Sequence, residues 1–306
     1  MPAPSTPSGP PAPEVLLRRL ELAVTRRLDG LLHGDHRGLV PDHGSESGEA
    51  RPYVEGDDVR RIDWNVTARM PEPHVRVTIA DRELETWLVV DRSASLDFGT
   101  AATTKRELAL SAAAAVALLT NRTGNRLGAV LAGSDRDRTL PPRGGREHLR
   151  LVLGQIAAAS AGPGPGDLAP ALRQLARPGH RRGLVAVISD FVGPPTWHRP
   201  LRALSARHDV LCVEVVDPRE LELPAVGTLT LVDPETGAAR EVRTSARLRR
   251  RYAEAAEAQR SEIARAVQEA GADHLRLATD RDWVLDVVRY VQARSRRAAV
   301  ARRPAR

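Results

Sequence analysis

The stretch Val89–Gly99, VVDRSASLDFG, decides how the rest of the chain is interpreted. It closes an apolar run with a carboxylate and then adds two serines, so that Asp91, Ser93 and Ser95 occupy every second position. A turn needs only one or two Ser, Asp or Gly residues. Two hypotheses remain open: a turn with more polar residues than it needs, or side chains that converge on a ligand.

Apolar strands and helical segments alternate from this stretch towards the C-terminus. Thr104 and Glu107 have capping-box spacing at the start of a helix, and Gly271 is a natural residue to follow the end of another. Such alternation indicates an α/β fold with a mostly parallel central sheet and helices on both faces. We expect a strand that ends at Asp91, strands at about 126–132, 183–189, 209–216 and 273–277, helices at about 103–121, 144–160, 167–177, 196–206, 245–270 and 281–294, and a hairpin around Pro234–Gly237.

The two ends of the chain differ in composition from this α/β domain, which we place at residues 81–292. Residues 1–13 are rich in Pro and Ser and are expected to be disordered. Residues 14–80 begin with an apolar stripe of helical period, and they predict a small subdomain with an N-terminal helix and a β-hairpin. Residues 293–306 carry six arginines and no acid, which predicts a flexible basic tail.

A second carboxylate, Asp190, follows the apolar run GLVAVIS as Asp91 follows its own strand. Ligands of open α/β sheets bind beyond the carboxyl ends of the strands, so both carboxylates are expected at one edge. Together with Ser93 and Ser95 they form an all-oxygen set that suits a hard cation, Mg²⁺ or Mn²⁺. The alternative is that both aspartates only cap helix N-termini, and spacing alone does not decide between the two.

The alternating motif resembles the first loop of the metal-ion-dependent adhesion site of von Willebrand factor A domains, and Asp190 matches the aspartate of its third loop. Residues 48–77, GEARPYVEGDDVRRIDWNVTARMPEPHVRV, resemble the signature of the bacterial domain of unknown function 58 family. His36, Lys105 and residues 279–284, TDRDWV, fit the same pattern. The resemblance implies a von Willebrand factor A-like fold.

This resemblance extends over residues 14–293. The metal ligands that it implies are Asp91, Ser93, Ser95 and Asp190. The second metal loop departs from the family pattern, because Gly166 stands where a threonine is usual. Glycine has no side-chain oxygen, so either a water takes its place or Asp167 turns inward, unless Asp167 caps the next helix. The departure predicts weaker cation binding.

The family signature alternates acids and arginines. An Arg guanidinium pairs bidentately with a carboxylate, which predicts an ion-pair network that holds this segment together. The alternative is a docking surface, and we favour the structural role because clustered ion pairs are more often structural than functional. Replacing Arg60, Arg61 or Trp64 is then expected to lower thermal stability. The network would contain Asp57, Asp58, Asp63, Arg51, Arg60, Arg61 and Arg69, flanked by Tyr53 and Trp64.

Composition argues against several other functions. The net charge of +7 comes from arginines interleaved with acids, and Lys105 is the only lysine, which indicates a solvated surface rather than a nucleic-acid site. The lone Cys212 excludes an intramolecular disulfide and a Cys-based zinc site, and there is no P-loop for ATP hydrolysis. No apolar segment approaches the ~20 residues of a membrane span. No signal peptide is present either, so a cytoplasmic location is expected.

The resemblance implies a non-enzymatic protein-interaction module, in which a partner's Asp or Glu completes the coordination of the cation. Family members resemble accessory proteins of MoxR-type AAA+ ATPases, which implies such an ATPase and an acidic-residue-bearing client as partners in complex assembly or maturation. One alternative is a magnesium-dependent phosphohydrolase with Asp91 as nucleophile, although Ser93 stands where such enzymes carry a second Asp. Another is an Arg-rich nucleic-acid binder, although aromatic residues for base stacking make up only 3% of the chain.

Overall fold

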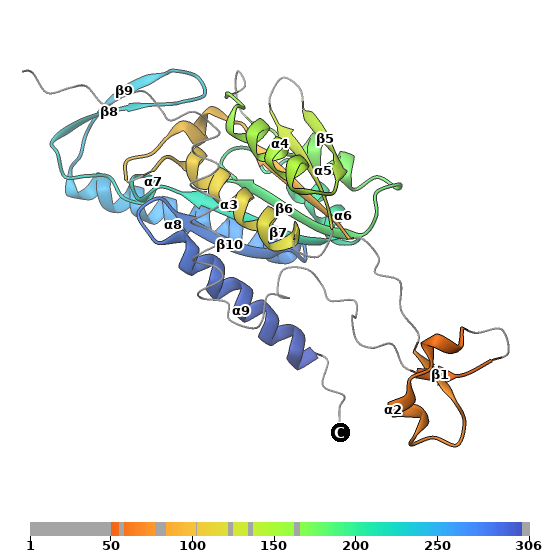
Figure 1. Ribbon diagram of the computed structural model, residues 1–306. Coiled ribbons are helices and arrows are strands. Elements are labelled where there is room, and N and C mark those ends of the chain that lie inside the picture. The colour runs from red at the N-terminus through yellow and green to blue at the C-terminus, as the bar shows by residue number, and fades with distance from the viewer. Residues whose placement is uncertain are drawn as a thin grey trace, which may run out of the picture. The chain divides into compact units, whose positions relative to one another are not determined.

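Figure 1 shows the computed structural model of the protein, which describes residues 50–54, 58–76, 84–101, 103–121, 125–133, 137–161 and 166–301. Contacts divide the chain into two compact units, one of them formed by residues 40–83. We call the described residues from 84 to 301 the sheet unit and those from 50 to 76 the small unit. The predicted disordered segment, the predicted N-terminal helix and His36 lie outside the described residues.

A six-stranded sheet forms the centre of the sheet unit, with strand order β10-β7-β6-β3-β4-β5. Every neighbouring pair is parallel except β4 and β5, which are antiparallel. The predicted α/β fold with a mostly parallel central sheet is therefore confirmed. The strands are β3 (Glu85–Asp91), β4 (Arg126–Ala132), β5 (Arg138–Arg143), β6 (Gly183–Ser189), β7 (Asp209–Val216) and β10 (Asp273–Ala278).

Helices cover both faces of this sheet. Leu88 and Val90 of β3 belong to one apolar core, while Trp87 and Val89 point to the opposite face and belong to a second core. All seven residues of β3 are consequently buried, as expected of a central parallel strand. The first core is closed by α3 (Lys105–Asn121), α4 (Arg146–Ala157) and α9 (Trp283–Ala301), and the second by α5 (Ala169–Leu175), α6 (His198–Ser205) and α8 (Ala246–Glu269).

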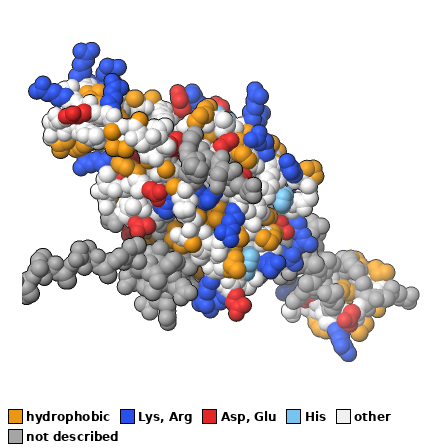
Figure 2. All heavy atoms as spheres, turned by 90° about the horizontal axis from the view of Figure 1, so that it is seen from above, with side chains coloured by type: hydrophobic (Ala, Val, Ile, Leu, Met, Phe, Trp, Pro, Cys, Tyr) orange, Lys and Arg blue, Asp and Glu red, His pale blue; other side chains and the backbone are white. Residues whose placement is uncertain are grey.

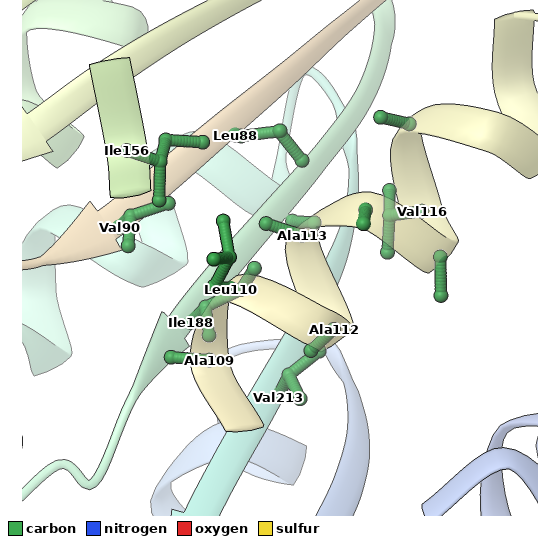
Figure 3. Packing of buried hydrophobic residues seen from close by; sticks show 14 of the residues in the cluster. Leu88, Val90, Ala109, Leu110, Ala112, Ala113, Val116, Ile156, Ile188 and Val213 are labelled. Atoms are coloured by element: carbon green, nitrogen blue, oxygen red, sulfur yellow. The ribbon is translucent and has the colours of Figure 1, made fainter. Parts of the chain in front are cut away.

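Helix α3 packs closely on the sheet because alanines line its inner face. Figure 3 shows Ala109 near Ile188 of β6, and Ala112 near Val213 of β7. These alanines are buried, and their small side chains let the helix backbone approach the strands at the density of a protein interior. The first residue of this helix is Lys105, so the same packing positions a lysine at the edge of the sheet.

Two elements differ from the sequence-based expectation. Strand β5 is absent from the predicted strands because its sequence, RTLPPR, holds two prolines, which sheets tolerate at their edges; β5 pairs only with β4. Helix α9 continues to Ala301, so the prediction of a flexible tail from residue 293 is wrong for residues 293–301. Arg294 holds this part of the helix by an ion pair of 2.5 Å to Asp273 of β10. Neither α9 nor another described helix is long and apolar enough to span a membrane.

A short helix and a hairpin lie between β7 and α8. They are α7 (Pro218–Leu221) and the pair β8 (Thr228–Val232) and β9 (Ala239–Arg243), which confirms the predicted hairpin. Gly237 closes its turn with φ +70°, a conformation that favours glycine. In Figure 1 the hairpin stands above α7.

The small unit contains β1 (Ala50–Pro52), η1 (Val59–Arg61), α2 (Trp64–Thr67) and β2 (His74–Arg76), with β1 and β2 antiparallel. Two signature acids act as helix caps: Asp58 accepts a hydrogen bond from the Arg60 amide, and Asp63 accepts one from the Asn65 amide. Trp64 is 70% exposed and Arg60 is exposed too. Neither side chain is buried, so the expected loss of thermal stability on replacing Arg60 or Trp64 has no buried ion pair or core contact behind it.

Candidate functional site

The candidate metal ligands lie at the carboxyl ends of two neighbouring strands. Strands β3 and β6 pair in parallel, with Val90 opposite Ile188. Asp91 is the last residue of β3, and Asp190 follows the last residue of β6. The two aspartates therefore share one edge of the sheet, which we call the rim. Their role as metal ligands stays a prediction.

Asp91 is buried and held from two sides. One carboxylate oxygen, Oδ1, accepts a hydrogen bond of 2.7 Å from the Ser93 amide, and the other accepts one of 2.6 Å from the Ser189 hydroxyl. Burial and the negative charge of Asp190 raise the pKa of Asp91, although these hydrogen bonds act in the opposite direction. A nearby cation would relieve both unfavourable effects.

The two serines of the motif face each other beside Asp91. The hydroxyl oxygens of Ser93 and Ser95 are 2.9 Å apart, so one hydroxyl donates a hydrogen bond to the other. Ser93 is the N-cap residue of η2 (Ala94–Asp97), and Ser95 lies inside that short helix. Both are buried, so two neutral oxygens lie next to the carboxylate.

Asp190 is paired with Lys105. Its Oδ2 accepts a hydrogen bond of 2.8 Å from the Lys105 ammonium, and its Oδ1 accepts one of 3.1 Å from the Val192 amide. Burial by itself lowers the pKa of Lys105, but the carboxylates of Asp190 and Glu220 outweigh burial and raise it. The ammonium therefore stays charged. This pair joins residues 85 positions apart. Its lysine is the single lysine of an arginine-rich chain and also fits the family pattern.

The Lys105–Asp190 pair continues into a larger buried charge network. Glu220 of α7 lies 2.5 Å from the Lys105 ammonium and 3.6 Å from Arg260 of α8. Arg260 also donates to the backbone carbonyl of Asp190 at 2.9 Å and pairs with Glu214 of β7 at 3.1 Å. The rim is thus tied to α7, α8 and β7 by paired charges, of which the sequence pattern points only to Lys105 and Asp190.

Gly166 brings the second loop against the rim. A Cβ atom at this position would lie 2.9 Å from Asp91 Oδ1 and 2.8 Å from Ser93 Cβ, closer than real side chains approach. Glycine therefore allows a backbone contact that the usual threonine would prevent in this loop position. Asp167 does not turn inward: its Oδ1 accepts hydrogen bonds of 2.9 Å from the Ala169 amide and 2.9 Å from the Thr196 hydroxyl. Asp167 thus accepts from the first amide of α5, while the N-cap residue of that helix is Leu168.

The donor set fits a weakly held hard cation. Asp91 and Asp190 supply carboxylate oxygens and the serine pair supplies hydroxyl oxygens, which Mg²⁺ or Mn²⁺ accepts while retaining several waters. Within the described ranges, no group of three or more His, Cys, Asp or Glu side chains is placed to hold a metal ion. Lys105 already compensates part of the negative charge of Asp190. This charge compensation favours the weak binding that the sequence predicts.

Comparisons with solved structures give weak matches. The crystal structure of a conserved hypothetical protein, BatB, from Bacteroides thetaiotaomicron aligns with a TM-score of 0.45 and 13% identity, over 70% of this chain and 99% of that one. The SpRpn10 VWA domain aligns with a TM-score of 0.37 and 11% identity, over 67% of this chain and 93% of that one.

Comparisons with other sequences are much stronger. "Uncharacterized protein Rv1480" of Mycobacterium tuberculosis is 55% identical over 287 residues, which cover 93% of this chain and 90% of that protein. "Uncharacterized protein MAV169" of Mycobacterium avium is 47% identical over 165 residues, 53% of this chain and 98% of that protein. The model of the family described as "Protein of unknown function DUF58" matches residues 49–262. The chain, with its signature segment and its rim, belongs to the DUF58 family.

Proposed function

We propose that this protein is a non-enzymatic, cation-dependent protein-interaction module. The observation that carries the proposal is the convergence of Asp91, Ser93 and Asp190 at the rim, where an all-oxygen set suits a hard cation. When bound, such a cation offers its open position to a carboxylate of another protein. The chain's own residues fix the donor atoms and neutralise the excess charge.

The partners that fit this chemistry are a MoxR-type AAA+ ATPase and a client protein that presents an Asp or Glu. The support is the family to which the chain belongs and the oxygen-rich rim at the carboxyl ends of β3 and β6. The protein then acts as an adaptor in the assembly or maturation of a complex.

A pull-down of a MoxR-type AAA+ ATPase, with and without EDTA, tests the proposal. We expect EDTA to weaken the interaction, and Asp91→Ala to remove the EDTA effect. Asp97→Ala is the matched control, because Asp97 belongs to the same η2 segment but is exposed and pairs with Arg106. An interaction that ignores both EDTA and Asp91→Ala contradicts the proposal.

The phosphohydrolase alternative predicts a different outcome in the same variants. Asp91 lies where a nucleophile would lie, but the residue two positions later is Ser93, which cannot serve as a general acid near neutral pH. The one nearby ammonium, Lys105, is engaged by two carboxylates. Turnover of a phosphoester that Asp91→Ala abolishes would favour the enzyme over the adaptor.

The nucleic-acid alternative has little support on the surface. Figure 2 shows Lys and Arg side chains scattered over one face, with acidic and hydrophobic side chains between them. Nucleic-acid binding needs basic side chains gathered along a patch or stripe. The interaction-module proposal therefore remains the better account of this surface.

A further inference from the structure

Arginines gather where the β8–β9 hairpin passes into α8. Residues 239–251, AREVRTSARLRRR, contain six arginines and a single acid, Glu241. Four of these arginines lie in the first six residues of α8, and the first turn of this helix holds no acidic residue. The N-terminus of a helix carries a partial positive charge, so cations are unfavourable there. Arg247 and Arg251 also lie four positions apart, where like charges on a helix repel. Helix stability therefore does not explain this cluster.

Few of these arginines are paired within the chain. Among the described residues their one ion pair joins Arg250 to Glu254 at 4.0 Å, and both of these side chains are exposed. The Nε atom of Arg249 is buried, and no hydrogen-bond acceptor lies beside it in the described part of the chain. A buried donor without an acceptor is unfavourable. The cluster can therefore pair with carboxylates that another molecule supplies.

Strand β9, which leads into this cluster, has a free edge. β8 and β9 form a two-stranded sheet, and within the described ranges neither strand pairs with a third; Figure 1 shows the hairpin projecting from the sheet unit. The Thr244 amide donates to the Gly227 carbonyl at one end of the ladder, and the Asp233 amide donates to the Ala238 carbonyl at the other. With this register, alternate residues of β9 turn their backbone N–H and C=O groups away from β8. Two such residues are Ala239 and Glu241. The outer edge of β9 can therefore pair with an extended peptide.

The charge of this edge selects the strand that pairs with it. Arg240 and Arg243 point to opposite faces of β9, so a strand laid beside β9 meets an arginine on each face. Carboxylates on that strand are attracted, while a second copy of this chain would bring the same arginines against its own. Nucleic acid is disfavoured as well, because residues 228–251 hold no aromatic side chain on which a base could stack.

We propose that the outer edge of β9 and the start of α8 form a docking surface for an extended acidic segment of a partner protein. The segment adds as a third strand, and its carboxylates pair with the arginines of β9 and α8. A third strand also stabilises the hairpin, because two strands alone are only marginally stable. This docking needs no cation, so the inference goes beyond the proposed function and does not depend on it.

Fluorescence anisotropy with labelled peptides of about ten residues, the length of a long strand, tests this docking. The full chain is titrated into a peptide that alternates Glu and Val, and into one that alternates Glu and Pro. Both peptides carry the same charge, but proline has no N–H and cannot complete a strand. We expect the Glu-Val peptide to bind about tenfold or more tightly than the Glu-Pro peptide, and added salt to weaken its binding.

Two double variants test the arginines. Arg240→Gln with Arg243→Gln removes the charges of β9, and Arg247→Gln with Arg251→Gln removes two charges of α8. Each double variant is expected to weaken binding of the Glu-Val peptide by about tenfold or more. The α8 variant is expected to keep or raise the melting temperature, because it removes a repulsive pair.

The control is Arg199→Gln with Arg202→Gln, which removes equal charge from exposed positions of α6 and is expected to bind the Glu-Val peptide like the wild type. Equal binding of the two peptides, unchanged binding in the β9 variant, or an equal loss in the α6 control would overturn the inference. Tighter binding of a poly-dT oligonucleotide would overturn it in favour of nucleic acid.

EDTA and Asp91→Ala separate this inference from the proposed function. Both are expected to leave binding of the Glu-Val peptide unchanged, since the docking surface contains no rim residue. Peptide binding that EDTA abolishes would place the peptide at the rim and overturn the hairpin site. Failure of the ATPase pull-down, with peptide binding intact, would contradict the proposed function alone.

Discussion

At the scale of single residues, Lys105 is the side chain that neutralises the buried carboxylates beside the rim. It is fully buried between Asp190 and Glu220. Lys105→Met removes the ammonium but keeps much of the volume, and it leaves Asp190 as an uncompensated buried charge. We expect a loss of about 3 kcal/mol in the free energy of unfolding, measured in urea. Arg289→Ala, which breaks an exposed ion pair with Asp286, is the control and is expected to cost under about 1 kcal/mol.

The stability contributed by Lys105 is expected to fall at alkaline pH. Burial lowers the pKa of Lys105, but Asp190 and Glu220 outweigh it, so the folded pKa lies above the ordinary value of 10.5. The stabilisation is therefore complete below pH 10.5 and is lost as the pH rises through the folded pKa. Urea unfolding at pH values on either side of this range is expected to show a smaller loss in Lys105→Met than in the wild type. An equal loss in both would contradict the assignment.

The stability contributed by Asp217 is expected to depend on pH in the opposite sense, with a loss at low pH. Its carboxylate accepts hydrogen bonds from the Thr100 amide and hydroxyl and from the Thr279 hydroxyl. Burial raises the pKa of Asp217, but these hydrogen bonds outweigh burial and lower it. Its stabilisation is present above the ordinary pKa of 3.8 and is lost as the pH falls through the lowered value. Asp217→Asn is expected to reduce stability by about 2 kcal/mol at neutral pH, and to flatten the acid limb of the unfolding profile.

At the scale of loops and strands, Gly166 makes a close approach that a larger residue cannot make. Gly166→Ala places a Cβ against Asp91 and Ser93, which are themselves buried and hydrogen-bonded. We expect a lower melting temperature and weaker Mn²⁺ binding. Gly144→Ala is the control, because nothing lies within 4 Å of its added Cβ and its φ is unexceptional. Unchanged binding in Gly166→Ala would show that the loop is not part of the rim.

The sequence predicts an element well where a local run of residues specifies it, and poorly where contacts between distant residues do. The bounds of β4, β6 and β7 match the predicted 126–132, 183–189 and 209–216, because each strand is a short apolar run between turn residues. Asp91 and Asp190 could be placed at one edge for the same reason. The Lys105 ion pairs could not be predicted, since they join residues far apart in sequence and depend on tertiary packing.

At the scale of the whole molecule, the small unit exposes a large aromatic side chain that is not packed into a core of its own. Trp64 is 70% exposed, so Trp64→Ala is expected to leave the melting temperature unchanged. Weaker capture of a MoxR-type ATPase by this variant would favour the docking role of the signature segment. A clear fall in melting temperature would favour the structural role of the signature segment instead. Arg69→Ala, in the same segment, is the comparison variant.

The two prolines of β5 have a consequence for how the molecule behaves among its own copies. Pro141 and Pro142 fall within the register shift between β4 and β5, on the outermost strand of the sheet. Neither residue has a backbone N–H, so this border cannot offer a continuous row of donors to a strand from another chain. Replacing both with valine is expected to increase light scattering on storage without changing the unfolding midpoint. The prolines thus hinder edge-to-edge pairing of this apolar sheet with the sheets of other copies.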